Sequence, residues 1–280
     1  MRSLIDPWYN LPMSDTAILC ITCPDKKGLI ASITGFIFQH KGNIVQLAQY
    51  TNRQGKKFFM RVEWELNNFD LSKTTLQKEL TSLAKKLGLT YQLFLGSERP
   101  KIAIFVSKYD HCLFDLLLRK RSGELSVDIP LIVSNHQELA PVAAMFKIPF
   151  KYIPITNKNK KAQEKATLKI LAQANIDCIV LARYMQILSR DFIKAYPCKI
   201  INVHHSFLPA FSGAKPYHQA FQRGVKVIGA TSHFVTEKLD AGPIIEQETI
   251  KISHEDTVED LIMKGRDLER KVLAQAVQLF

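Results

Sequence analysis

The sequence has no long hydrophobic run. No apolar stretch in its 280 residues is long enough to span a bilayer, and the first residues, MRSLIDPWYNLPMSD, lack the continuous apolar core of a signal peptide. We therefore expect a soluble, cytoplasmic protein with no membrane partner, in which residues 1–15 form a flexible tail. With 46% hydrophobic residues, the chain can bury a substantial core.

Cysteine is also scarce. The chain has five scattered cysteines, an odd number that predicts reduced thiols rather than a disulfide framework: Cys20, Cys23, Cys112, Cys178 and Cys198. Cys20 and Cys23 have the spacing of a metal or redox pair. However, no second pair exists, and residues three apart on a strand point to opposite faces, so buried thiols are the better interpretation.

Acidic residues are outnumbered, which leaves a formal net charge of +12. The lysines and arginines are spread along the chain, and only residues 157–165, NKNKKAQEK, form a basic cluster, with the pattern of a solvated helix start. We therefore expect no nucleic-acid partner. A positively charged protein also attracts small anions such as polycarboxylates, so the charge alone does not assign a function.

Residues 16–96 alternate strands and helices in the order βαββαβ. A strand, AILCITC, precedes a helix with an apolar face at Leu29, Ile33 and Ile37. Two strands flank the turn NRQGK, an amphipathic helix runs between Ser72 and Gly88, and TYQLFL is a final strand. This order predicts a ferredoxin-like plait.

The first turn of this region, CPDKKGLIASI, resembles the ligand loop of ACT domains, small regulatory modules that often bind amino acids. The resemblance places Asp25 and Gly28 in a D-x-x-G-L pattern and implies an effector site there. Gly28 allows a tight turn into the helix, whose N-terminus offers backbone N–H groups to a carboxylate. The alternative is a turn that serves only the fold. ACT modules commonly pair, which implies a homo-oligomer, either a dimer or a tetramer.

Residues 97–280 follow the polar link GSERP and have a different pattern. Strands rich in Val and Ile alternate with helices, which predicts a doubly wound, Rossmann-like parallel sheet. Such sheets bind ligands beyond the carboxyl ends of their strands.

Two strands of this second region end in polar residues. The segment INVHH carries Asn202, His204 and His205, and a later one carries His233 and Asp240. An amide can donate to an oxyanion, a histidine can exchange protons, and a carboxylate can take a proton from water. Asn202 and His204 share one face of the strand, whereas His205 points away. His205 and His233 also fit a structural, supporting role.

This set of residues lacks two common catalytic devices. No Ser or Cys stands in a nucleophile-elbow context, which favours direct attack by water or an amine. Three histidines and an Asp could in principle bind zinc. However, no two histidines have i, i+4 spacing and no cysteines cluster, so no metal is expected.

Residues 202–247 closely resemble the core motif of the folate-dependent formyltransferase family, N-x-H-x-S-L-L-P followed by H-x-V-x-x-x-x-D-x-G-x-I. The resemblance implies that Asn202, His204 and Asp240 surround the formyl group of 10-formyltetrahydrofolate. The segment LARYMQILSRDF resembles the folate-binding loop of this family. It implies binding of the substrate by Arg183, Tyr184, Met185, Gln186, Ile187 and Leu188, with His205, Lys215 and His233 as further candidates.

An ACT module ahead of such a domain resembles the formyltetrahydrofolate deformylase family. This implies hydrolysis of 10-formyltetrahydrofolate to formate and tetrahydrofolate, feeding one-carbon and purine metabolism, with the folate as substrate and no cofactor. Residues 106–117 replace the glycine-rich phosphate loop of glycinamide ribonucleotide formyltransferases, and His205 and Gln186 stand where those enzymes have Pro and Arg. The alternatives are formyl transfer to an amine acceptor and a non-catalytic folate or amino-acid sensor.

Overall fold

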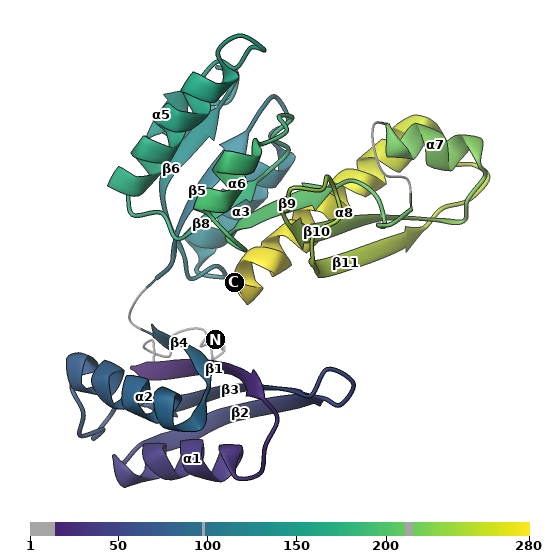
Figure 1. Ribbon diagram of the computed structural model, residues 1–280. Helices are drawn as coiled ribbons and strands as arrows, with labels where there is room; N and C mark the ends of the chain where they lie inside the picture. Colours follow the sequence, from purple (N-terminus) through teal and green to yellow (C-terminus); the bar gives the residue numbers. More distant parts are fainter. Residues whose placement is uncertain (1–14, 97–98, 211–214) are drawn as a thin grey trace, which may run out of the picture. The chain divides into compact units, whose positions relative to one another are not determined.

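The computed structural model describes residues 15–96, 99–210 and 215–280. The expected tail, residues 1–15, lies outside these ranges except for Asp15. The chain divides into two compact units, Met1–Arg99 and Pro100–Phe280, each with a hydrophobic core of its own (Figure 1). No helix within the described ranges is both long enough and apolar enough to cross a membrane.

The first unit is a four-stranded antiparallel sheet with two helices, α1 (Leu29–Gln39) and α2 (Lys73–Leu87). Its strands run in the order β2-β3-β1-β4 across the sheet. Their bounds are β1 (Thr16–Pro24), β2 (Asn43–Asn52), β3 (Lys57–Glu65) and β4 (Thr90–Leu95). This arrangement is the ferredoxin-like plait that the element order predicted.

The core of the first unit is formed by apolar side chains at alternate positions of its strands. On β1, Leu19, Ile21 and Cys23 are buried and pack with Ile33 of α1 and Leu80 of α2. Cys20 is only half-buried and lies on the other face of the strand, because neighbouring side chains of a strand alternate. Cys20 and Cys23 are both free thiols, but only Cys23 is buried, so the prediction of two buried thiols was wrong for Cys20.

Local signals determine where the helices of the first unit begin and end. The hydroxyl of Ser72 accepts a hydrogen bond from the Thr75 backbone N–H and caps α2, and Gly88 ends that helix in a left-handed conformation with φ 60°. Gly28 precedes α1 with φ 85°, a backbone conformation that favours glycine. All three residues hold the positions that the sequence predicted.

The second unit is built on a seven-stranded sheet with the order β11-β10-β9-β8-β5-β6-β7. The strands are β5 (Lys101–Val106), β6 (Asp128–Ser134), β7 (Phe150–Tyr152), β8 (Cys178–Leu181), β9 (Ile200–His204), β10 (Val227–Phe234) and β11 (Ile244–Lys251). The five strands β7, β6, β5, β8 and β9 are parallel to one another. Strand β10 pairs antiparallel with β9 on one side and with β11 on the other. The expected parallel sheet is therefore mixed, because β10 runs opposite to both of its neighbours, β9 and β11. The short connection from β10 to β11 leaves no room for a crossover.

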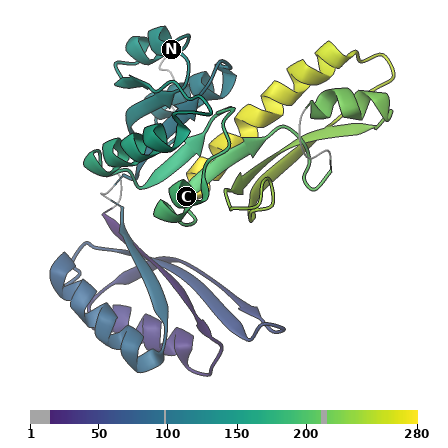
Figure 2. The same ribbon diagram turned by 45° about the horizontal axis from the view of Figure 1, so that its top comes forward.

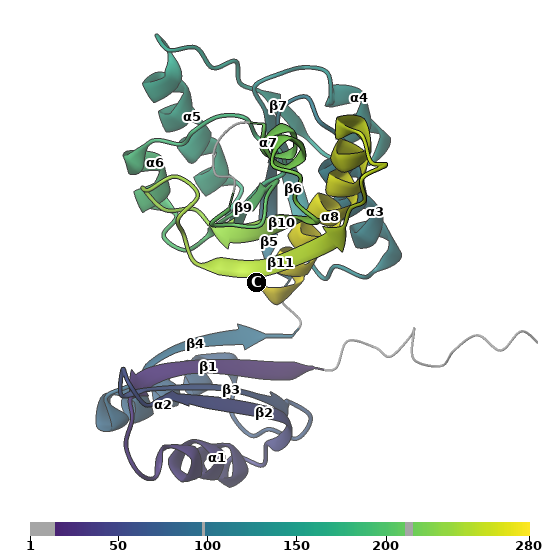
Figure 3. The same cartoon turned by 90° about the vertical axis from the view of Figure 1, so that its right-hand side faces the viewer.

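Helices cover both faces of this sheet (Figure 3). On one face lie α3 (His111–Ser122), α4 (Ala140–Met145) and α8 (Val258–Leu279), and on the other lie α5 (Lys160–Gln173) and α6 (Arg190–Ala195). The basic residues 157–165 contain the first turns of α5, in agreement with the predicted helix start. This doubly wound arrangement buries the strands on both sides.

Two further features position the site. Strands β5 and β8 are neighbours from which the sheet grows in opposite directions, which is the switch point where such sheets bind ligands. The helix α8 runs alongside β10 and β11, and the short helix α7 (Pro216–Gln222) packs against it (Figures 1 and 2).

Candidate active site

A cavity of about 630 Å³ lies in the second unit at the carboxyl ends of β8 and β9. Every site residue that the sequence predicted for this unit lines it. These residues are Arg183, Tyr184, Met185, Gln186, Ile187, Leu188, Asn202, His204, His205, Lys215, His233 and Asp240.

Asn202 lies opposite His233 across the antiparallel pair of β9 and β10. The His233 Nδ1 lies 2.9 Å from the carbonyl oxygen of Phe234, so we assign the ring proton to Nδ1. The other ring nitrogen, Nε2, then accepts a hydrogen bond of 3.2 Å from the amide Nδ2 of Asn202. His233 therefore orients the amide of Asn202, and its own side chain is almost fully buried.

His204 forms the second pair of the site, with Asp240. Its Nδ1 lies 3.4 Å from one carboxylate oxygen of Asp240, and the other oxygen lies 3.8 Å from Nε2 of His233. Asp240 stands in the turn between β10 and β11 with φ 51°, a left-handed conformation that Asp tolerates better than most residues. One partly buried carboxylate thus lies close to both histidines.

These four side chains together provide an amide donor, a proton-carrying imidazole and a carboxylate within one largely buried site. Low exposure strengthens each electrostatic interaction, because few water dipoles screen it. The set can stabilise a developing oxyanion and can move a proton.

His205 follows the last residue of β9, so the alternation of the strand does not determine its direction, and it lines the same cavity as His204 and Asp240. Its ring centroid lies 5.2 Å from that of His204 and 5.9 Å from that of Tyr217. Burial, and then the positive charge of Arg183, lower the pKa of His205 to about 3. His205 is therefore neutral near pH 7.

The loop after β8, residues 183–188, is held at several points. Arg183 has a left-handed backbone conformation with φ 62°, and its guanidinium carbon lies 4.9 Å from the ring centre of Tyr109. The ring of Tyr184 packs edge-on against Phe105. The backbone N–H of Met185 donates to the hydroxyl of Ser107 over 2.9 Å. Met185 and Ile187 of this loop are both more than half exposed and line the cavity.

Lys215, Asp25 and Gly28 complete the predicted residues. Lys215 precedes α7 with φ 53° and is exposed at the wall of the cavity. Asp25 and Gly28 are exposed in the turn before α1, in the first unit. The backbone N–H of Asp25 donates to the carbonyl of Lys56, which joins this turn to the residue just before β3.

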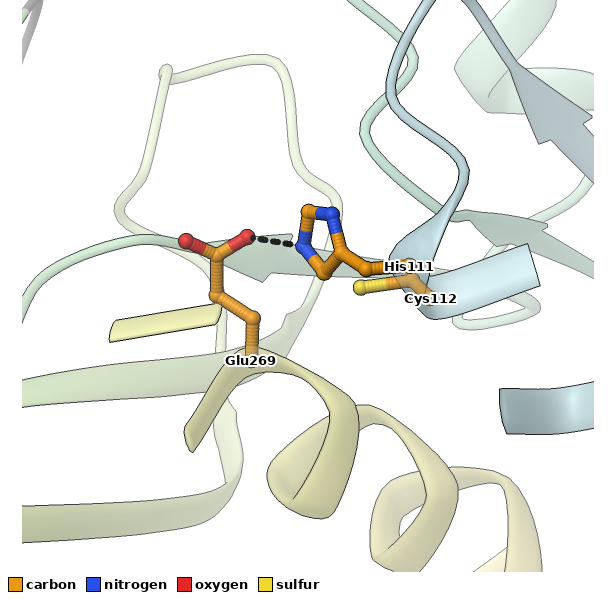
Figure 4. Close-up of side chains that lie close together, drawn as sticks. All are labelled: His111, Cys112 and Glu269. Atoms are coloured by element: carbon orange, nitrogen blue, oxygen red, sulfur yellow. Dashed lines mark hydrogen bonds and ion pairs between the residues drawn. The ribbon is translucent and has the colours of Figure 1, made fainter. Parts of the chain in front are cut away.

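A group that the sequence did not predict shares the cavity. Glu269 of α8 is 1% exposed, and its carboxylate accepts hydrogen bonds of 2.9 Å from the hydroxyl of Tyr217 and from Nε2 of His111 (Figure 4). The Nε of Arg183 lies 3.5 Å from the same carboxylate. Burial raises the pKa of Glu269, but the hydrogen bond from His111 and the charge of Arg183 outweigh it and leave the pKa below its ordinary value.

The donor atoms of His111, Cys112 and Glu269 all lie within 4.8 Å of one another, as in a transition-metal site (Figure 4). Their surroundings oppose a cation, because both carboxylate oxygens are already hydrogen-bonded and the guanidinium of Arg183 is nearby. Burial also raises the pKa of the Cys112 thiol well above its ordinary value, which disfavours the thiolate that metals bind.

One sequence signal would have pointed to α8. Thr257 and Asp260 form a capping box, in which the Thr257 hydroxyl accepts from the Asp260 backbone N–H and the Asp260 carboxylate accepts from the Thr257 N–H. This pattern, followed by apolar residues at helical spacing, marks the start of the helix. It does not reveal that Glu269 faces the cavity.

Comparison with known proteins matches both units. The formyl transferase family model covers residues 100–277, and the ACT domain model covers residues 15–93. A protein of Synechocystis named formyltetrahydrofolate deformylase is 53% identical over 264 residues, which are 94% of this chain and 93% of that one.

Solved structures agree with this match. The structure of a formyltetrahydrofolate deformylase from Pseudomonas syringae superposes with a TM-score of 0.93 at 38% identity and covers 95% of this chain and 89% of that one. A phosphoribosylglycinamide formyltransferase from Bacillus halodurans has a TM-score of 0.60 at 33% identity and covers 64% of this chain and 94% of that one. With both domains matched and relatives of such identity spanning nearly its whole length, the chain belongs to the formyltetrahydrofolate deformylase family.

Proposed function

We propose that this protein hydrolyses 10-formyltetrahydrofolate to formate and tetrahydrofolate. The observation that carries the proposal is the joining of Asn202, His204 and Asp240 at one cavity, in a chain that belongs to the deformylase family. All five cysteines are free thiols, which is consistent with a protein that functions in the reducing environment of the cytoplasm.

The reaction begins with water at the formyl carbon. Asp240 takes one proton from the water as the new C–O bond forms, and the formyl oxygen becomes an oxyanion. The amide of Asn202, oriented by His233, donates to that oxyanion, and so does protonated His204. Oxyanion stabilisation of this kind is often the largest single contribution to the rate.

The second half of the reaction releases the folate. His204 gives its proton to the folate nitrogen as the C–N bond breaks, so tetrahydrofolate leaves as an amine. Asp240 and formic acid then each lose a proton to solvent, and His204 regains a proton from solvent at the ring nitrogen that donated, while its Nδ1 stays at the 3.4 Å contact with Asp240. Each group is thus restored for the next cycle.

The substrate lies against residues 183–188, with the exposed apolar side chains of Met185 and Ile187 against the pteridine ring. Lys215 and the positive charge of the protein attract the glutamate carboxylates of the folate. His205 serves as a neutral wall of the cavity.

The reaction needs no metal or other cofactor. Asn202 and His204 stabilise the negative charge of the oxyanion, and the protons move between water, Asp240 and His204. Prolonged dialysis against a chelator is therefore expected to leave the rate of formate release unchanged.

The deciding test is formate release by the purified protein with no acceptor present. We expect formate from the wild type and a loss of at least about a hundredfold in kcat for Asn202→Ala, because an oxyanion donor is removed. Asn67→Ala, an exposed turn residue of the first unit, is the matched control and should retain full activity. Turnover only when an amine is added would make the protein a transferase, and no turnover in either assay would favour a sensor.

The first unit is proposed to bind an amino-acid effector at the turn from Asp25 to Gly28, which supplies backbone N–H groups at the start of α1. We further propose that the protein works as a homo-oligomer. Titration of formate release with single amino acids, and light scattering of the purified protein, test these two statements.

A further inference from the structure

The hydrolysis described above does not use Glu269, although this buried carboxylate lines the same cavity. Its Oε1 accepts from the Tyr217 hydroxyl, and its Oε2 contacts both His111 and Arg183. We refer to Glu269, His111, Arg183 and Tyr217 as the Glu269 cluster. The cluster satisfies its own carboxylate, because both oxygens have partners within it.

The fold makes room for this cluster. Gly265 lies one turn before Glu269 on α8, and a Cβ atom there would come within 2.1 Å of the Tyr217 ring and hydroxyl. Only a glycine therefore lets the Tyr217 ring lie across α8 and reach Glu269. On the other side, Arg183 is held over the ring of Tyr109 and His111 begins α3. Four separate segments of the chain meet at one carboxylate.

The cluster adjoins the reacting groups through His205. The His205 ring contacts Tyr217 on one side and His204 on the other. His204 contacts Asp240 on one side, and the Glu269 cluster lines the same cavity on the side of His205.

The fold of the second unit does not by itself select water as the attacking group, since a protein named phosphoribosylglycinamide formyltransferase shares that fold. An amine acceptor needs space and polar partners in the cavity. To bind in the region of the cluster, it would have to separate His111, Tyr217 or Arg183 from a buried carboxylate, which is strongly unfavourable. Water requires no such rearrangement.

We propose that the Glu269 cluster determines the specificity of the reaction by excluding amine acceptors, so that water receives the formyl group. This inference rests on the proposed function. In both reactions the bond between the formyl carbon and the folate nitrogen breaks and that nitrogen gains a proton. With water a C–O bond forms and formate is released, whereas with an amine a C–N bond forms and an N-formyl amine is released.

The test is a competition between water and an added amine in the full-length protein. The substrate is 10-formyltetrahydrofolate, the amines are hydroxylamine and glycinamide, and the measurement is the ratio of formylated amine to formate. His111→Ala opens the cluster while leaving Glu269 paired with Arg183, and Glu269→Ala is a second variant in case the first does not fold. His254→Ala, an exposed histidine, is the matched control.

We expect the wild type and His254→Ala to release formate almost exclusively, and the two cluster variants to raise the ratio at least about tenfold. A general loss of stability would lower both products together and leave the ratio unchanged. An unchanged ratio in variants that still turn over, or efficient formylation of amines by the wild type, would overturn the inference alone. If the wild type releases no formate, the proposed function fails and the inference fails with it.

Discussion

The side-chain amide of Asn202 is oriented by His233, which takes no part in the proposed proton transfers. Because His233 donates from Nδ1 to the Phe234 carbonyl, its Nε2 can only accept, and the Asn202 amide must present its N–H₂ group to it. The amide donor of the site is thereby oriented before substrate binds. Such preorganisation avoids the cost of reorienting dipoles during the reaction.

The carboxylate of Asp240 is predicted to be essential for the chemical step. Asp240→Asn keeps the shape of the side chain and tolerates φ 51°, but it removes the base, so kcat for formate release should fall by about 100- to 10,000-fold. The dissociation constant for tetrahydrofolate, measured by fluorescence, should change only a few-fold. Asp267→Asn, on the exposed side of α8, is the control. A drop in folate affinity that matched the drop in kcat would contradict the assignment.

The depressed pKa of His205 predicts acid sensitivity. Below pH 6.5 the unfolded chain binds a proton at His205 that the folded protein does not bind until about pH 3, so stability falls as the pH is lowered through this range. The slope from this residue is at most about 1.4 kcal/mol per pH unit.

Urea unfolding between pH 4 and 7 measures this slope. His205→Asn has no proton to gain, so its free energy of unfolding should depend less steeply on pH than that of the wild type. Glu269, whose pKa is lowered in the folded state, contributes a further loss only below about pH 4.5 and does so in both proteins. Equal slopes in the two proteins would show that His205 titrates normally.

Among the elements, α8 links the core of the second unit to its cavity. Leu268, Val272 and Leu273 of this helix are buried against the sheet, while Glu269 faces the cavity. Helical periodicity makes this possible, because residues one position apart point about 100° apart around the axis. Movement of α8 would therefore displace Glu269 and the Tyr217 ring that depends on Gly265.

Gly265→Ala tests how tightly α7 and α8 pack. Alanine in place of glycine inside a helix ordinarily stabilises by up to about 1 kcal/mol. At position 265 the new Cβ would overlap the Tyr217 ring, so we expect a lower melting temperature and slower formate release. Gly35→Ala in α1 has no atom within 4 Å of the new Cβ and should be neutral or stabilising. Equal effects at the two positions would argue against close packing at Tyr217.

At the scale of the whole molecule, the two units have separate hydrophobic cores. Trp64 lies fully buried in the first core, and residues 100–280 contain no tryptophan. Tryptophan fluorescence, in a Trp8→Phe background, therefore reports on the first unit, whereas formate release reports on the second.

Ile33→Ala tests whether the two units unfold independently. Ile33 is fully buried in the first core, and truncation of such a side chain lowers stability by about 2–5 kcal/mol. We expect the fluorescence transition in urea to move to lower concentration while the loss of formate release stays where it is. Ile104→Ala, in the second core, should do the reverse. If both variants shifted both signals equally, the units would unfold as one.

The sequence was most informative where the physical cause is local. Ser72 begins α2 and Gly88 ends it, and each was predictable because a cap interacts only with its own end of the helix. Asn202 and His204 lie on one face of β9 because the side chains of a strand alternate. Asp240 was found as a polar residue after a predicted strand, the loop 183–188 was located through a resemblance in motif, and the structure brings both to one cavity.

By itself, the sequence determined the two-domain α/β organisation, the family, and the residues expected to react. Only the tertiary structure decided that β10 and β11 run antiparallel and that Glu269 meets His111 across 158 positions of the chain. The physical reason is that periodicity and capping are properties of neighbouring residues. The partner of a buried charge, by contrast, depends on how helices that are distant in sequence pack on the same sheet.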